Sequence, residues 1–272
     1  MTSISKFIRQ FPGTLILLTF LLFPLGTGCS VSHGDDYDVN AAYQAAVDDA
    51  AVAEPDEISR NLTAIVPWEP GLIWQGVPGQ SRVLVVTWTS STYYDNDVGN
   101  DYYWLPQGAN VWVTAVPQLK NFFRDEYVHW IDFPTLRAEQ LLGLPPDNGK
   151  TKFIEIWVDP VDLFRPSPDP EITDHEAGLS FPYQNSLFLA FDTTQLIKDW
   201  IGGVEGVYTF EEWFEARKAA SYVGDAPYPW TRLGYTYDWG GIDEEGLSEF
   251  VIRGGTTIGI KSVTPNEDYL QR

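Results

Sequence analysis

The sequence predicts an α+β fold, a single β-rich mixed domain with a few short helices that follows a signal peptide and an acidic tether. Three observations support this prediction. Runs of β-branched and apolar residues outnumber segments with helical periodicity. Hydrophobic residues make up 44% of the chain and charged residues 20%, a balance typical of chains that bury a core. No internal repeat and no second linker divides the 272 residues, so we expect one domain at 61–272.

Charge and cysteine content exclude two classes of protein. The net charge is −21, from 38 acidic and 17 basic residues. Binding to nucleic acid requires a basic surface that displaces counterions from phosphate, so we expect no nucleic-acid partner. The single cysteine excludes an internal disulfide framework.

Residues 1–28 have the features of a signal peptide. Lys6 and Arg9 supply positive charge, and an apolar stretch at 15–25 follows them. This stretch is shorter than the roughly 20 residues that a membrane-spanning helix needs, and it ends in small residues. We therefore expect export, with cleavage at the end of this segment.

The leader ends in the sequence Leu25-Gly26-Thr27-Gly28-Cys29. It resembles the lipobox of bacterial lipoproteins, with Gly26 at the position that usually holds leucine. The resemblance implies that Cys29 becomes the N-terminus and carries a diacylglyceryl group and an N-linked acyl chain such as palmitate. Ser30 stands where an aspartate often retains lipoproteins in the inner membrane, which implies outer-membrane sorting with the body in the periplasm. The alternative is an ordinary signal peptide, with Cys29 incidental.

Residues 29–60 are expected to form the tether. They begin with an acidic stretch and continue into an Ala-rich, acidic run at 41–57. Alanine favours a helix, but an apolar face made mostly of alanine buries little area. As a flexible chain, the tether would reach about 30 Å.

Beyond residue 60, β-branched and aromatic runs predict strands. Glu155 interrupts one of these apolar runs. The pair Gly254-Gly255 lies between two apolar segments and predicts a hairpin. The predicted strand segments are 82–89, 110–116, 152–158, 186–191, 231–239 and 250–263.

Four segments are predicted to be helices because residues typical of helix ends flank them. Pro117 occupies a first turn, Gly143 follows an amphipathic run, and Gly202-Gly203 follows another segment. Thr209 begins a sequence similar to a capping box. The predicted helices are 117–126, 134–144, 193–201 and 209–220.

Several catalytic motifs are absent from the sequence, including G-x-S-x-G, H-E-x-x-H, the P-loop and G-x-G-x-x-G. The chain has three histidines, at positions 33, 129 and 175, which nearly excludes a histidine-rich zinc site. Any catalysis would therefore depend on carboxylates, serine or tyrosine.

The first candidate site is a possible calcium loop. Asp95, Asp97 and Asp101 surround Gly99, and alternate acids on a turn can supply oxygen ligands to Ca²⁺. The EF-hand spacing is not met, and the alternative is a solvated turn between strands. Apart from this calcium, we expect no cofactor.

The second candidate site is a proline-rich loop at 159–176. Its candidate catalytic groups are Asp169, Glu171, Asp174 and His175. Proline restricts the loop, and polar loops next to a rigid sheet often carry function. The alternative is a structural crossing in which Arg165 pairs with an acid of the loop.

The third candidate site is an aromatic segment. Tyr235, Tyr237 and Trp239 would share one strand face and could stack on sugar rings. The alternative is packing in the core. Asp238 and Glu249 add carboxyl groups, and glycoside cleavage requires a pair of them.

These features lead to two main hypotheses. The first is an envelope-anchored lipoprotein, held to the membrane through Cys29, that acts as a binding or assembly module for a glycan or protein partner. The alternative is a carboxylate-dependent hydrolase of cell-wall or imported polysaccharide. A calcium-stabilised domain is a third possibility.

Overall fold

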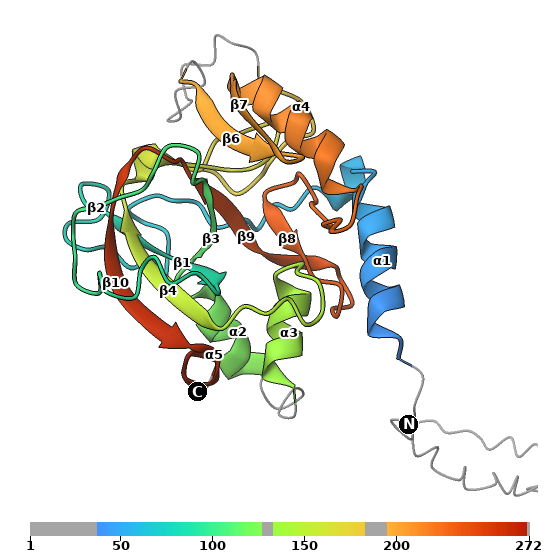
Figure 1. The fold of residues 1–272 in the computed structure, drawn as a ribbon, viewed down its shortest axis with the longest axis horizontal. Helices are drawn as coiled ribbons and strands as arrows, with labels where there is room; N and C mark the ends of the chain where they lie inside the picture. The colour runs from blue at the N-terminus through green and yellow to red at the C-terminus, as the bar shows by residue number, and fades with distance from the viewer. Residues whose placement is uncertain (1–36, 127–132, 183–194, 271–272) are drawn as a thin grey trace, which may run out of the picture. The chain divides into compact units, whose positions relative to one another are not determined.

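An antiparallel sheet of eight strands is at the centre of the fold in the computed structural model (Figure 1). Its strand order is β2-β10-β4-β1-β3-β9-β5, and β8 pairs with β9 beside this path. A separate hairpin contains β6 and β7. The strands are β1 Val83–Thr89, β2 Tyr103–Trp104, β3 Val111–Ala115, β4 Lys152–Val158, β5 Leu163–Phe164, β6 Ile197–Ile201, β7 Val204–Tyr208, β8 Tyr235–Tyr237, β9 Glu245–Ile252 and β10 Thr257–Pro265.

The structure describes residues 37–126, 133–182 and 195–270. In this part of the chain, the α-helices are α1 Val39–Ala50, α2 Gln118–Glu126, α3 Pro134–Leu141, α4 Phe210–Ser221 and α5 Asn266–Tyr269. The prediction of a single β-rich α+β domain with short helices is confirmed.

Some predictions fall outside the described residues. They are the signal peptide at 1–28, Cys29, and the strand at 186–191. None of the helices that the structure describes has the length and apolar character needed to cross a bilayer.

Local sequence signals predicted most of the central elements. β1, β3 and β4 lie within the predicted strand segments. α2 and α4 match the predicted helices to within one residue at each end, and α3 begins as predicted but ends three residues earlier. Thr209 caps α4 in a capping box with Glu212, as its sequence indicated.

The helix predicted at 193–201 is wrong from Ile197 onward, where the chain forms β6. Burial alternates along this strand, with Ile197, Asp199 and Ile201 facing inward. Gly202 and Gly203 both have positive φ and turn the chain into β7, so they form a hairpin turn rather than a helix end.

The hairpin predicted at Gly254-Gly255 is also wrong. β9 and β10 follow one another in the chain, but β9 pairs with β3, β5 and β8, whereas β10 pairs with β4 and β2. Gly254 allows close approach instead, because a Cβ atom there would lie 2.8 Å from the Pro106 carbonyl oxygen.

The two faces of the sheet bury different clusters. One face encloses a core of aliphatic residues from β1, β3, β4, β9 and β10, including Val85, Ile156 and Phe250. The other face packs against α2, α3 and α5 through Val86 and Phe153, and against α4 and the β6–β7 hairpin. The candidate site described below lies on this second face.

The predicted tether contains a docked helix from Val39, which corrects the boundary at residue 61. Tyr43 and Val47 of α1 are buried against Tyr237 and Trp239. The Tyr43 hydroxyl also donates to the Pro227 carbonyl at 2.8 Å. The sequence argument failed because two larger residues, and not alanine alone, form the buried face of α1. The compact unit therefore begins at Asp38.

Candidate functional site

The sheet splits between β1 and β3. These strands pair at Val85↔Ala115 and Val86↔Thr114, and the register stops there. Beyond this point β1 continues along β4 as far as Thr89, and β3 continues along β9 as far as Val111. The two halves of the sheet therefore separate at one end of the β1–β3 pair.

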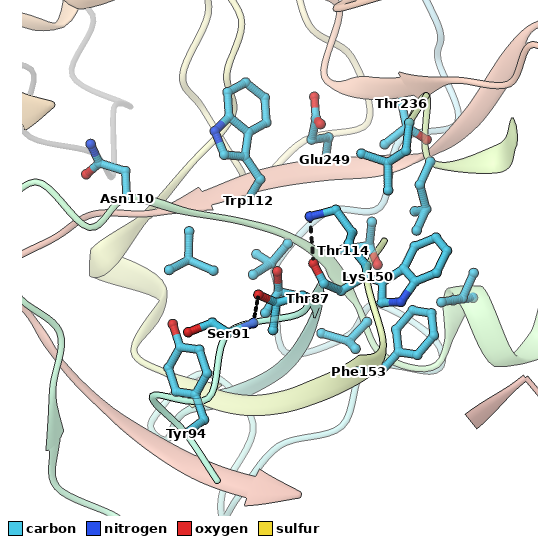
Figure 2. A pocket seen from close by; sticks show the side chains of 18 of the residues that line it. Thr87, Ser91, Tyr94, Asn110, Trp112, Thr114, Lys150, Phe153, Thr236 and Glu249 are labelled. Atoms are coloured by element: carbon cyan, nitrogen blue, oxygen red, sulfur yellow. Dashed lines mark hydrogen bonds between the residues drawn. The ribbon is translucent and has the colours of Figure 1, made fainter. Parts of the chain in front are cut away.

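A pocket of about 350 Å³ occupies this split. Its size is near the lower end of the range for small-molecule sites, roughly 300–1,000 Å³. Figure 2 shows the pocket with β3 and β9 on one side and Lys150 and Phe153 on the other. The lining residues are Val86, Thr87, Trp88, Thr89, Ser91, Tyr93, Tyr94, Asn110, Val111, Trp112, Val113, Thr114, Leu119, Leu142, Leu144, Lys150, Phe153, Tyr228, Thr236 and Glu249.

Aromatic side chains and uncharged polar groups dominate this lining. Trp112 is half-buried and lies in an edge-on arrangement with Tyr228, with ring centroids 6.3 Å apart. Tyr93 is 78% exposed at the side of the pocket. Ser91, Asn110 and several threonines supply hydroxyl and amide groups. Such a surface suits an uncharged ligand with both an apolar face and hydrogen-bonding groups.

Glu249 is a buried acid on the wall of the pocket. It lies on β9 opposite Thr114 of β3, and the Tyr228 hydroxyl donates to its carboxyl oxygen at 3.2 Å. Burial raises the pKa of Glu249 to about 8, so the carboxyl is mostly protonated at neutral pH. In that form it can donate a hydrogen bond as well as accept one.

Lys150 lies on the opposite side of the pocket. Its ammonium group donates to the Trp88 carbonyl oxygen at 3.1 Å, shown by a dashed line in Figure 2. Burial lowers the pKa of Lys150. The lysine thus satisfies a main-chain acceptor of β1 at the point where β3 has moved away.

The proline-rich loop holds itself together. The guanidinium of Arg165, which is fully buried, donates to the side chain and carbonyl of Asp174 and to the Glu171 carbonyl. The carboxyl of Glu171 accepts from the main-chain N–H of Thr173, and that of Asp169 from the N–H of Glu171. These contacts support the structural alternative for the loop.

His175 also has a structural contact. Its Nδ1 atom lies 2.7 Å from the Leu62 carbonyl oxygen, and its Nε2 atom lies 3.7 Å from the Glu69 carboxylate. None of Asp169, Glu171, Asp174 and His175 lines the pocket in the split sheet.

The aromatic row is part of the core. Tyr235, Tyr237 and Trp239 are all buried, and the two tyrosine hydroxyls donate to the Glu57 carbonyl and the Asp49 carboxylate. Their burial favours packing over stacking on a sugar, although Tyr235 and Tyr237 also line a separate pocket of about 220 Å³. The core alternative is the arrangement observed.

Asp238 belongs to a buried ion pair and does not face an open cleft. Both of its carboxylate oxygens accept from the Arg137 guanidinium, at 2.7 and 2.5 Å. Of the acids singled out in the sequence, Glu249 is the one that lines the pocket among the described residues.

The three acids of the possible calcium loop do not converge. Asp95 pairs with Lys152 at 2.5 Å, Asp97 accepts from Asn100, and Asp101 accepts from Gln75. Among the described residues, no group of three acidic, histidine or cysteine side chains is arranged to hold a metal.

A second buried acid lies on the same sheet face but far from Glu249. Glu155 of β4 lies opposite Val86 of β1, and Val86 lies opposite Thr114 of β3. Thr114 in turn lies opposite Glu249 of β9. Three strand spacings separate the two acids, or about 14 Å. Glycosidase carboxyl pairs lie roughly 5–9.5 Å apart. Glu155 is also held by Lys120 and Lys261.

The sequence did not indicate Lys150 and Trp112 as parts of a site, and it singled out Tyr228 only as the start of the aromatic segment of the third candidate. They come from separate segments, and only the interrupted pairing of β1 and β3 brings them together. One signal was present: an acid inside an apolar strand, as at Glu249, is costly to bury without a role or a partner.

Comparisons with known proteins add no relative. No family model, curated protein or solved structure matches the chain.

Proposed function

We propose that this chain is an envelope-anchored lipoprotein whose body binds one sugar unit of a glycan in the pocket between β1 and β3. The single observation that carries the proposal is the composition of this pocket, in which aromatic rings lie beside hydroxyl, amide and carboxyl groups. Sugars have apolar ring faces and a rim of hydroxyl groups, so both kinds of surface are complementary to them.

The charges of the pocket are consistent with an uncharged ligand. Lys150 is engaged with the Trp88 carbonyl, and Glu249 is mostly neutral at pH 7. A cationic ligand would lose its hydration without gaining an ionised acid as partner, which is costly in a half-buried site. The pocket volume favours one sugar unit over a long oligosaccharide.

The test is a binding assay with the full chain in detergent. We would measure tryptophan fluorescence during titration with monosaccharides, and retention on insoluble polysaccharides and cell-wall material. Trp112→Leu is expected to weaken binding about tenfold. The matched control is Trp200→Leu, because Trp200 is 58% exposed on β6 and does not line the pocket.

Circular dichroism of both variants would show whether they fold. If the wild-type chain binds no glycan, or if the two variants bind equally well, the proposal is wrong. A protein partner would then be sought by crosslinking in the envelope.

Carboxylate-dependent hydrolysis is a second candidate, and one observation favours it. The pKa of about 8 makes Glu249 a proton donor at neutral pH, which is the property of a general acid. Release of soluble fragments from polysaccharide, abolished by Glu249→Gln, would support an enzyme. Retention without release would support a binding module.

A further inference from the structure

We propose that the ligand carries a secondary amide, which bridges the main chains of β1 and β3 where their pairing is interrupted. The inference rests on the proposed function of this pocket and names the chemical group that the pocket recognises. An N-acetylated amino sugar and a peptide bond both supply this group. The proposed function favours the amino sugar.

The main-chain groups that face the split follow from the register of β1 and β3. The Leu84 carbonyl accepts from the Val116 N–H at 3.1 Å, and Val86 pairs with Thr114. Alternate residues of a strand direct their main-chain groups to the same side. The N–H and C=O of Trp88 on β1, and those of Trp112 on β3, therefore point toward each other across the split.

One main-chain hydrogen bond between Trp88 and Trp112 is missing at the split. Continuing the ladder would require the Trp88 N–H to donate to the Trp112 carbonyl. The register ends one pair earlier, so this bond is not made in the described structure. A donor on β1 thus faces an acceptor on β3, with the pocket between them.

The Trp88 carbonyl already has a hydrogen-bond donor. It accepts from the Lys150 ammonium at 3.1 Å. The lysine replaces the Trp112 N–H as the donor to this carbonyl, and the Trp88 N–H and the Trp112 carbonyl are left to the ligand. A buried main-chain group without a partner is costly, so a ligand that supplies one gains affinity.

A trans secondary amide fits this arrangement because its C=O and N–H point in opposite directions. The carbonyl can accept from the Trp88 N–H while the N–H donates to the Trp112 carbonyl. A carboxylate lacks the donor, and an ammonium group lacks the acceptor. The aromatic ring of Trp112 is then available for the remainder of the ligand.

The test compares matched ligands on the full chain in detergent. Glucose, glucosamine and N-acetylglucosamine place a hydroxyl, an ammonium and an acetamido group at the same ring position. We expect N-acetylglucosamine to bind at least tenfold more tightly than either of the others. The 2-O-acetyl ester of glucose keeps the carbonyl but loses the N–H, and is expected to bind about tenfold more weakly than the amide.

The outcomes separate this inference from the proposed function. Equal binding of glucose and N-acetylglucosamine would overturn the amide inference and leave sugar binding intact. Tight binding of N-acetylalanine methylamide without binding of any sugar would support amide recognition and overturn the sugar proposal. No binding of any of these probes would overturn both.

Hydrogen exchange supplies a readout at the atoms concerned. Exchange of the Trp88 amide proton should slow at least tenfold when N-acetylglucosamine binds. The amide protons of the β6–β7 hairpin, outside the pocket, are the internal control and should not change. An unchanged Trp88 rate in the bound protein would overturn the inference.

Discussion

Glu249 combines two features that seldom occur together at one residue. It is buried in a strand, and it lines a pocket on one side of the sheet. The Tyr228 hydroxyl donates to it, but this hydrogen bond does not offset the effect of burial on the pKa. The residue should therefore couple the stability of the domain to pH.

The sign of this coupling follows from the raised pKa. Between the ordinary value near 4.5 and about 8, the folded state holds a proton that the unfolded state has released. Stability contributed by this group is present below pH 4.5, falls as the pH rises through this window, and is lost above about 8. The effect is about 3–5 kcal/mol.

We therefore predict that Glu249→Gln removes this part of the pH dependence. The free energy of unfolding would be measured in urea at pH 5 and at pH 9. Between these two pH values, it should decrease by about 3–5 kcal/mol less in the variant than in the wild type. Glu267→Gln is the control, because Glu267 is exposed on α5. The same pH dependence in the wild type and in both variants would contradict the raised pKa.

At the scale of elements, the sequence predicted what depends on neighbouring residues. The β-branched run of β1 and the capping box of α4 are local signals, and both elements form as predicted. The segment that forms β6 was predicted as a helix because Gly202 and Gly203, which follow it, fit a helix end as well as a hairpin turn. Local residues do not distinguish the two when the partner strand β7 is not considered.

Pairing and docking could not be predicted in the same way. The separation of β9 from β10, and the end of the β1–β3 ladder after Val86, depend on pairing between segments that are far apart in the sequence. The candidate site is a consequence of that interruption. The sequence therefore identified Glu249 as one acid among several, without the pocket that it lines.

Helix α1 provides a test of where the folded body begins. Val47 is buried against Tyr237 and Trp239, whereas Val52, just beyond the helix, is 63% exposed. Val47→Asp should cost about 3 kcal/mol or more, because it removes an apolar contact and buries a carboxylate. Val52→Asp should be nearly neutral. Equal urea midpoints for the two variants would contradict the docking of α1 against Tyr237 and Trp239.

At the scale of the whole molecule, our proposal gives the body and the lipid anchor separate contributions. The leader has two basic and no acidic residues, so its removal takes the net charge from −21 to −23. Anionic lipid would repel such a body rather than hold it. In our proposal the lipid on Cys29 therefore supplies the attachment, at about 0.8 kcal/mol for each buried CH₂ group.

This division leads to the last prediction. Expressed in a bacterium that processes lipoproteins, the wild-type chain should stay in the membrane fraction after carbonate washing and enter the detergent phase on phase separation. Cys29→Ala should move to the soluble fraction, because it leaves no site for the acyl chains that give stable anchoring. Ser30→Ala tests whether any change next to the cleavage site has this effect, and should behave like the wild type. A Cys29→Ala protein that stays in the membrane would remove lipidation from the proposed function. The pocket between β1 and β3 would be unaffected, because Cys29 is outside the residues that form it.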